Sequence, residues 1–151
     1  MAYLLTIIEC SFWFLLWTFV IYWCHRVAHI IPYVRLIHFE HHKFISTNPP
    51  PVWHWSNLFL FQDNLASTID VWITEFIPTI IFCSITNQWW ILLLFYLWSA
   101  LIQEQIEHNP KFNKFPLFTS GKWHLIHHKN KNYNYGIFVP FWDMMFGSYK
   151  K

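Results

Sequence analysis

Residues 3–24 form an apolar run long enough to cross a lipid bilayer, and this run constrains the fold more than any other feature of the sequence. A membrane-spanning helix needs about 20 mostly apolar residues, because the hydrocarbon core is roughly 30 Å thick. The run lacks a basic leading segment and a small-residue cleavage site, so we do not expect a removable signal peptide. Composition agrees: 55% of the residues are hydrophobic and 12% are charged, whereas a typical soluble domain carries about 25% charged residues.

A second apolar block covers residues 65–106 and is interrupted by the polar residues 86–88. Its length allows two topologies. It forms either one span over 76–102 or a hairpin of two spans, near 68–85 and 89–106.

The basic residues decide between these topologies. All ten Lys and Arg residues lie in 26–43 and 111–151. A hairpin puts both segments on one side of the membrane, which is the cytoplasmic side by the positive-inside rule, whereas a single span separates them. We therefore predict the hairpin, although it places Asp70 and Glu75 in a membrane helix, where a charge is costly unless it is paired or faces the protein interior. The net charge of +2 does not indicate a nucleic-acid partner, and we expect none.

Histidine occupies 10 of 151 positions, and the pattern H-x-x-H-H occurs twice, at 38–42 and 124–128. Two chance matches are expected in only about 0.1% of chains with this histidine frequency. On a helix the three histidines of each motif share one face, as do the two of HRVAH (25–29). Together with the histidine at the inner end of the third span, the predicted topology brings nine histidines to one membrane face: His25, His29, His38, His41, His42, His108, His124, His127 and His128.

Nine neutral imidazoles exceed the ligand number of one ion, so we expect two ions with four or five nitrogen ligands each. A structural zinc site usually includes thiolates, but Cys10, Cys24 and Cys83 lie singly in apolar runs, and we interpret them as buried small residues. An oxygen-activating di-iron pair fits better, because redox chemistry needs open coordination positions. Zinc in a purified sample is compatible with the same ligands. His54, which follows the prolines at 49–51, is interpreted as structural.

Further residues resemble a known family. YWCHR (22–26), the eight residues between HRVAH and HFEHH, and the ending NYNYGIFVPFWDMMFGSYK (132–150) are similar to the fatty acid hydroxylase/sterol desaturase superfamily of membrane di-iron enzymes. The resemblance covers about residues 20–150 and is closest to the C-5 sterol desaturase branch. The chain departs from the pattern at Thr18, where relatives often carry an acid, and at Ile137, where Gln usually follows Asn-Tyr-Gly. One span precedes HRVAH, where relatives usually have more.

The resemblance implies an all-α integral membrane helical bundle with a cytoplasmic His-rich di-metal site, built from one domain over 1–151 with cytoplasmic segments 25–64 and 108–151. It implies an endoplasmic reticulum location, two iron ions, O2, and electrons from NAD(P)H through a cytochrome b5-type partner. The expected reaction is desaturation or hydroxylation of a sterol or acyl lipid C–H bond, at the metal centre itself. Eight of the nine histidines correspond to the core ligands of the family, and His108 corresponds to a further histidine after the last span.

Several alternatives stay open. A fatty acid or sphingolipid hydroxylase of the same superfamily is the alternative enzyme, and a membrane metal-binding or transport protein is the non-enzymatic one. An inactive family member is a third. Asp143 and Trp142 either support the site or close a turn, and Glu104 either orients a ligand or is solvated at a helix end. We interpret the aromatic residues of the third span as lipid-facing rather than as a substrate slot: Trp89, Trp90, Phe95, Tyr96 and Trp98.

Overall fold

The computed structural model describes residues 2–48, 50–62, 64–112, 119 and 121–151, and these residues form helices joined by loops, with no strand among them. This confirms the predicted all-α class. The elements are α1 (Ala2–Ala28), α2 (Pro32–Thr47), η1 (Trp55–Phe59), α3 (Leu65–Val71), η2 (Trp72–Phe76), α4 (Ile77–Thr86), α5 (Trp89–Leu101), α6 (Gln103–Glu107), α7 (Lys122–Lys129) and α8 (Phe141–Met145).

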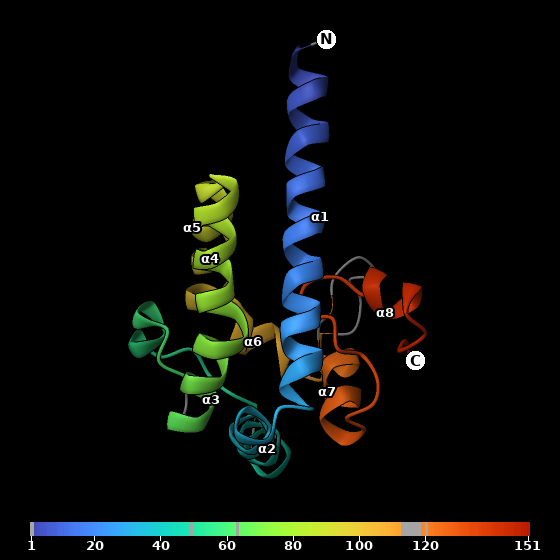
Figure 1. Cartoon of the computed structure of the whole chain (residues 1–151). Coiled ribbons are helices and arrows are strands. Elements are labelled where there is room, and N and C mark those ends of the chain that lie inside the picture. Colours follow the sequence, from blue (N-terminus) through green and yellow to red (C-terminus); the bar gives the residue numbers. More distant parts are fainter. Residues whose placement is uncertain (1, 49, 63, 113–118, 120) are drawn as a thin grey trace.

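Helix α1 is apolar around most of its circumference, and its stretch Tyr3–Ala28 is long and apolar enough to cross a membrane. Its first turns extend past the neighbouring helices (Figure 1), so their side chains are exposed. Cys10 lies on this part and is exposed, so the prediction that all three cysteines are buried is wrong there. Cys24 is half-buried, and Cys83 is buried in the core.

A helical hairpin lies where the sequence predicts a hairpin of two spans. Helix α3, the π-helical turn η2 and helix α4 run on as one stretch, Leu65–Thr86, which is also long and apolar enough to cross a membrane. Asn87, in the left-handed backbone region (φ 59°), ends α4, and α5 returns beside it (Figure 1). The expected third span of 89–106 is longer than α5, which ends at Leu101 because Ile102 leaves the helical conformation (φ −126°).

The core lies between α1 and the hairpin. Trp17 is fully buried there, with its ring 4.5 Å from that of Phe138 and 6.4 Å from that of Phe95. Its indole Nε1 donates a hydrogen bond to Thr79 Oγ1 at 2.9 Å, which joins α1 to α4. Trp89, Trp90 and Tyr96 are exposed as expected of lipid-facing residues, whereas Phe95 is buried and Trp98 is half-buried, so that interpretation is wrong for these two.

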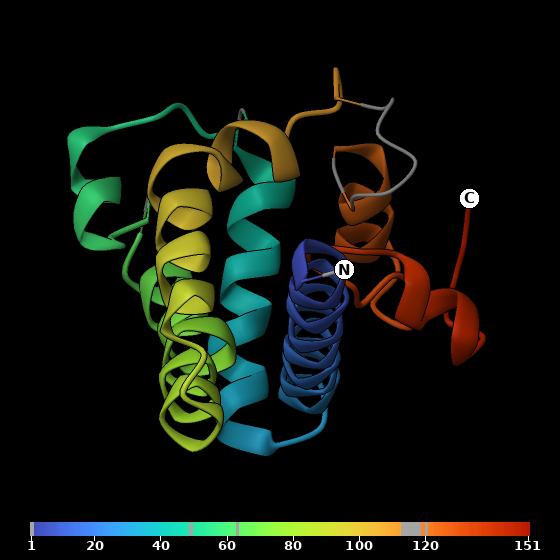
Figure 2. The same cartoon turned by 90° about the horizontal axis from the view of Figure 1, so that it is seen from above.

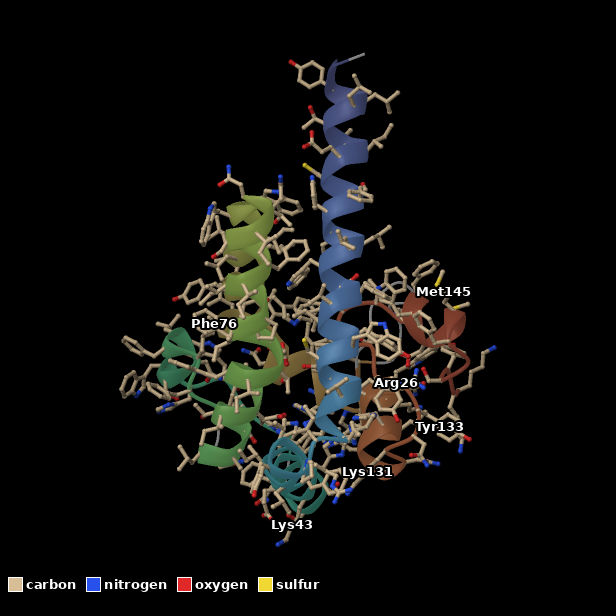
Figure 3. The ribbon with its side chains drawn as sticks, in the orientation of Figure 1. Arg26, Lys43, Phe76, Lys131, Tyr133 and Met145 are labelled. Carbon is tan, nitrogen blue, oxygen red and sulfur yellow. The ribbon has the colours of Figure 1, made fainter. Side chains whose placement is uncertain are left out.

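Helix α2 crosses the base of the bundle, below the upright helices (Figure 1), and it is seen along its length from above (Figure 2). The chain turns into it through Ile30 and Ile31, and Pro32 occupies its first turn, where the missing N–H removes no hydrogen bond. Helix α7 packs beside α2. Lys43 and Lys131 lie at this lower end of the molecule (Figure 3), so the base that holds the His motifs is also basic.

Candidate metal centre

Two helices hold the duplicated histidine motifs. Helix α2 buries His38, His41 and His42 on one face, and α7 buries all three histidines of its own motif. The i, i+3, i+4 spacing therefore places each triplet as the sequence predicts. His25 lies on the last turns of α1, but His29 lies just beyond the end of that helix.

Gly121 fixes the start of α7. Its φ is +50°, and a Cβ atom there would lie 1.9 Å from the carbonyl oxygen of Phe112 and 2.5 Å from that of Asn109. Its N–H donates to the carbonyl oxygen of Ile106 at 3.0 Å. Only glycine fits this conformation and spacing, and the contact brings α7 against the chain that carries His108.

The nine predicted histidines converge in two adjoining groups. In each group the potential ligand atoms lie within 4.8 Å of one another. We call them the five-histidine group and the four-histidine group. The rings of His42 and His128 stack across the boundary, with centroids 4.2 Å apart. The five-histidine group consists of His25, His29, His38, His42 and His127, and the four-histidine group of His41, His108, His124 and His128.

The distances between ring nitrogens in the five-histidine group match those of nitrogens that bind one cation. Nε2 of His38 lies 3.2, 3.0 and 2.9 Å from Nε2 of His25, His29 and His42. One imidazole nitrogen has a single hydrogen or a single lone pair, so hydrogen bonds cannot satisfy three such contacts. Nitrogens bound about 2.0–2.1 Å from one ion lie about 2.8–3.4 Å apart at bond angles of 90–110°. In the four-histidine group, Nε2 of His124 and His128 are 2.9 Å apart.

The hydrogen bonds of Nδ1 determine which nitrogen of each ring is available to bind a metal. Nδ1 of His25 donates to the carbonyl oxygen of Tyr135 at 2.6 Å, and Nδ1 of His127 donates to that of Tyr133 at 2.7 Å. Nδ1 of His38 lies 2.9 Å from both carboxylate oxygens of Asp70. Each bond holds the hydrogen on Nδ1 and leaves the Nε2 lone pair facing the centre of the group, as a metal ligand requires.

Burial keeps most histidines of the cluster neutral. Burial lowers the pKa of His41 to about 3 and, with the neighbouring imidazoles, that of His29 to about 2. Burial likewise puts the pKa values of His124, His127 and His128 well below 6.5. Neutral imidazoles at pH 7 are the form that binds metal. The residues therefore fit two metal ions bound through nitrogen.

Asp70 and Glu75, the two acids of the predicted membrane helix, face the protein interior, as the hairpin topology requires. Both line a cavity of about 20 Å³ beside the histidines, together with Gln103, Glu107 and His108. Gln103 Nε2 donates to both carboxylate oxygens of Glu75 at 3.2 Å. Residues five apart on an α-helix point about 140° apart, but the π-helical turn η2 follows Asp70 and includes Glu75, and both acids face one cavity. No sequence pattern indicated this turn.

The C-terminal segment supports the five-histidine group. Asp143 is buried, and its carboxylate accepts hydrogen bonds from the backbone N–H groups of Tyr135 and Gly136 at 2.8 Å and from Ser148 Oγ at 2.7 Å. This loop supplies the carbonyl that holds His25. Of the two roles open to Asp143, the structure therefore favours support of the site.

Three other residues have structural roles. Trp142 Nε1 donates to Thr18 Oγ1 at 3.0 Å, so the residue at the departure from the family pattern ties α1 to α8. His54 caps η1 by accepting a hydrogen bond from Ser56 N, consistent with a structural histidine. Arg26 donates to Tyr22 Oη at 2.7 Å, at the lower part of α1 (Figure 3). The Glu104 side chain lies outside the described part of the structure.

An apolar pocket of about 190 Å³ opens between α1 and α5, and it is lined by Phe14, Trp17, Leu94, Trp98 and Phe138. Two adjacent residues of the chain link this pocket to the cavity beside the histidines. Phe138 lines this pocket, while its neighbour Ile137 lines the polar cavity beside the histidines. Thr119 holds both residues, because its Oγ1 donates to the carbonyl oxygen of Ile137 and its N–H to that of Phe138.

The comparison with protein families agrees with this geometry, since the family described as fatty acid hydroxylase matches residues 10–148. The chain belongs to this family. A Delta(7)-sterol 5(6)-desaturase of Leptosphaeria maculans is 31% identical over 138 residues, covering 87% of this chain and 34% of the relative. A probable Delta(7)-sterol 5(6)-desaturase of Neurospora crassa is 30% identical over 135 residues, covering 88% and 36%.

A putative Delta(7)-sterol-C5(6)-desaturase of Arabidopsis thaliana is also similar, with 30% identity over 132 residues, 86% of this chain and 44% of the relative. These relatives support the C-5 sterol desaturase branch that the motifs predicted. The chain spans about a third of the length of the fungal relatives. No solved structure matches it significantly. Family membership and the two apolar helices together identify an integral membrane protein.

Proposed function

We propose that this protein is a membrane di-iron oxidoreductase that uses O2 to desaturate or hydroxylate a C–H bond of a lipid, with a sterol as the favoured substrate class. The observation that carries the proposal is the division of nine histidines into two adjoining groups of five and four, each of which fits one metal ion. Similarity to sterol desaturases supplies the reaction class.

The protein's part is to hold the nitrogens in place. The backbone carbonyls of Tyr133 and Tyr135 and the carboxylate of Asp70 keep hydrogens on Nδ1, so that Nε2 binds the metal. Two iron ions, when bound, supply the one-electron chemistry with O2 that side chains do not. Removal of two hydrogens from the lipid, with reduction of O2 to two waters, takes two electrons and two protons from elsewhere. We propose NAD(P)H as their source, through a cytochrome b5-type donor.

The apolar pocket between α1 and α5 is the proposed place for the lipid. Its lining is made of aromatic and aliphatic side chains of the two membrane helices and Phe138, so it suits hydrocarbon from the surrounding bilayer rather than a polar head. Phe138 lines this pocket, and its neighbour Ile137 lines the cavity beside the histidines. The pocket accommodates part of a sterol or an acyl chain, so an acyl lipid hydroxylase is the outcome that the functional test must distinguish.

The proposed orientation follows from charge. All Lys and Arg residues lie in 26–43 and 111–151, the two segments that contain α2 and α7. Lys43 and Lys131 lie at the base of the molecule (Figure 3). By the positive-inside rule this base faces the cytoplasm, where a soluble electron-donor domain has access. We propose the endoplasmic reticulum as the membrane, as expected for sterol synthesis in this family.

The test is expression of the full chain in a fungal host that lacks its own sterol C-5 desaturase, followed by lipid profiling. A His127→Ala, His128→Ala double variant at matched expression is the control. A new ring double bond in the host sterols, absent with the double variant, supports the proposal. A new hydroxylated acyl lipid selects the hydroxylase. Unchanged lipids with a metal-loaded protein and an active donor contradict the enzymatic function.

A further inference from the structure

Asp70 is an acid within a membrane helix, and it contacts the histidine at the centre of the five-histidine group. Both of its carboxylate oxygens lie 2.9 Å from Nδ1 of His38, and both residues are at least 95% buried. His38 is the histidine whose Nε2 approaches three other Nε2 atoms. The sequence distance of 32 residues between the pair means that this contact joins α3 of the hairpin to α2 at the base.

We infer that Asp70 is a positioning residue for the five-histidine group: it sets the tautomer of His38 and gives that ligand the negative charge that the imidazoles lack. The inference rests on the proposed function, because it concerns the metal site. A carboxylate behind a histidine fixes the ring and raises its basicity as a ligand. It also explains why the helix keeps an acid at a depth where an unpaired charge is unfavourable.

The four-histidine group is supported in a different way. Its own acid, Glu107, has Oε1 3.7 Å from Nδ1 of His124, which is longer than a hydrogen bond. There Nδ1 of His41 lies 2.9 Å from Ser67 Oγ, a neutral hydroxyl on the same helix one turn before Asp70. Ser67 is itself held by Asn64, whose Nδ2 donates to the hydroxyl at 2.8 Å. One short helix therefore supports a histidine of each group, one through a charge and the other through a hydroxyl. The two groups therefore have different supporting contacts, and the direct contact of Asp70 is with the five-histidine group.

Local structure holds Asp70 in this role. Asn64 caps the start of α3 by accepting a hydrogen bond from Ser67 N at 2.9 Å. At the other end, Thr74 Oγ1 donates to the carbonyl oxygen of Asp70 at 2.7 Å, at the start of the π-helical turn. The carboxylate is thus presented from a fixed backbone, so its substitution changes the contact with His38 more than the path of the helix.

The experiment compares Asp70→Asn with Ser67→Ala in detergent-purified full chain, titrated with Co²⁺ and competed with a chelator. Asparagine keeps the shape and an acceptor oxygen but removes the charge. We expect the parent to bind two ions per chain and Asp70→Asn to lose 10–100-fold in affinity at one position only. Ser67→Ala is expected to weaken the other position. The cobalt absorption spectra of the two variants, compared with that of the parent, report at which histidine group the binding has changed.

A second comparison guards against poor folding of the single variant. In a His38→Ala background, Asp70→Asn is expected to cause no further loss, because the residue acts through His38. An additional loss at both positions in that background identifies Asp70 as a merely structural residue and overturns the inference. Wild-type affinity at both positions in Asp70→Asn also overturns it, while the proposed function stands. A parent chain that binds no metal overturns the proposed function and, with it, the inference.

Discussion

Replacement of Gly136 by alanine tests how the C-terminal segment supports the metal centre. A Cβ atom at this position would lie 2.5 Å from the carbonyl oxygen of Val139 and 2.8 Å from Oδ2 of Asp143. Both atoms must move, because Cβ atoms do not approach oxygen this closely. The carboxylate then loses its bonds to the N–H groups of Tyr135 and Gly136, which are 2.8 Å long in the native chain.

The magnitude follows from these two bonds. A hydrogen bond to a charged group contributes about 1.5–3 kcal/mol, so Gly136→Ala is expected to lower the free energy of unfolding by roughly 3–6 kcal/mol. The carbonyl of Tyr135, which holds Nδ1 of His25 at 2.6 Å, moves with the loop. We therefore expect metal affinity to fall by about tenfold or more, as for loss of a contact that orients a ligand.

Gly147→Ala is the matched control. Gly147 has a φ of +69°, but a Cβ atom there meets nothing within 4 Å. The substitution is expected to cost about 1–2 kcal/mol through backbone strain alone and to leave metal affinity unchanged. The assays are thermal unfolding in detergent and metal content after dialysis. Equal metal affinity in Gly136→Ala and Gly147→Ala would refute the reasoning that the loop positions a ligand.

Three further predictions concern acid, the apolar pocket and the helix contact in the core. Metal-free protein is expected to lose stability as the pH falls below 6.5, because the folded chain holds the pKa of His41 near 3 while the unfolded chain takes up the proton. This residue alone lowers the free energy of unfolding by about 1.4 kcal/mol at pH 5.5. Equal unfolding midpoints at pH 7.5 and 5.5 would contradict the prediction. Phe138→Ala is expected to lower stability by about 3–5 kcal/mol and to increase labelling of Trp17 by a photoreactive alkyl probe, since both residues line the pocket; unchanged labelling counts against a hydrocarbon site. Thr79→Val removes the acceptor of the buried Trp17 indole N–H and is expected to cost about 1–3 kcal/mol, whereas Ser84→Ala on an exposed position of the same helix is expected to be near neutral in the same unfolding assay.

Much of the site was predictable because local spacing determines it. Histidines at i, i+3 and i+4 share a helix face in any context, so α2 and α7 present their triplets as expected. The position of the hairpin turn at Asn87 followed from polar residues within an apolar block and from the placement of the basic residues. These signals come from the spacing of nearby residues or from the apolar and basic segments that a membrane requires, and both can be read from the sequence.

The remaining features depend on contacts between distant segments. The carbonyls of Tyr133 and Tyr135 orient His127 and His25 through backbone atoms, so the type of these two residues does not reveal the contact. The π-helical turn that follows Asp70 and includes Glu75 has no sequence signal, and the end of α5 at Leu101 was equally hidden because the apolar pattern continues through Ile102. The contact between Asp70 and His38 became visible only when the hairpin and α2 were placed together.

The metal content of detergent-purified protein tests the central claim most directly. The two histidine groups predict about two iron ions per chain in the parent, and a large loss in the His127→Ala, His128→Ala double variant, which removes one ligand from each group. Two zinc ions in place of iron would support the ligand set but would not support the redox role. Metal at background in both proteins would contradict the account.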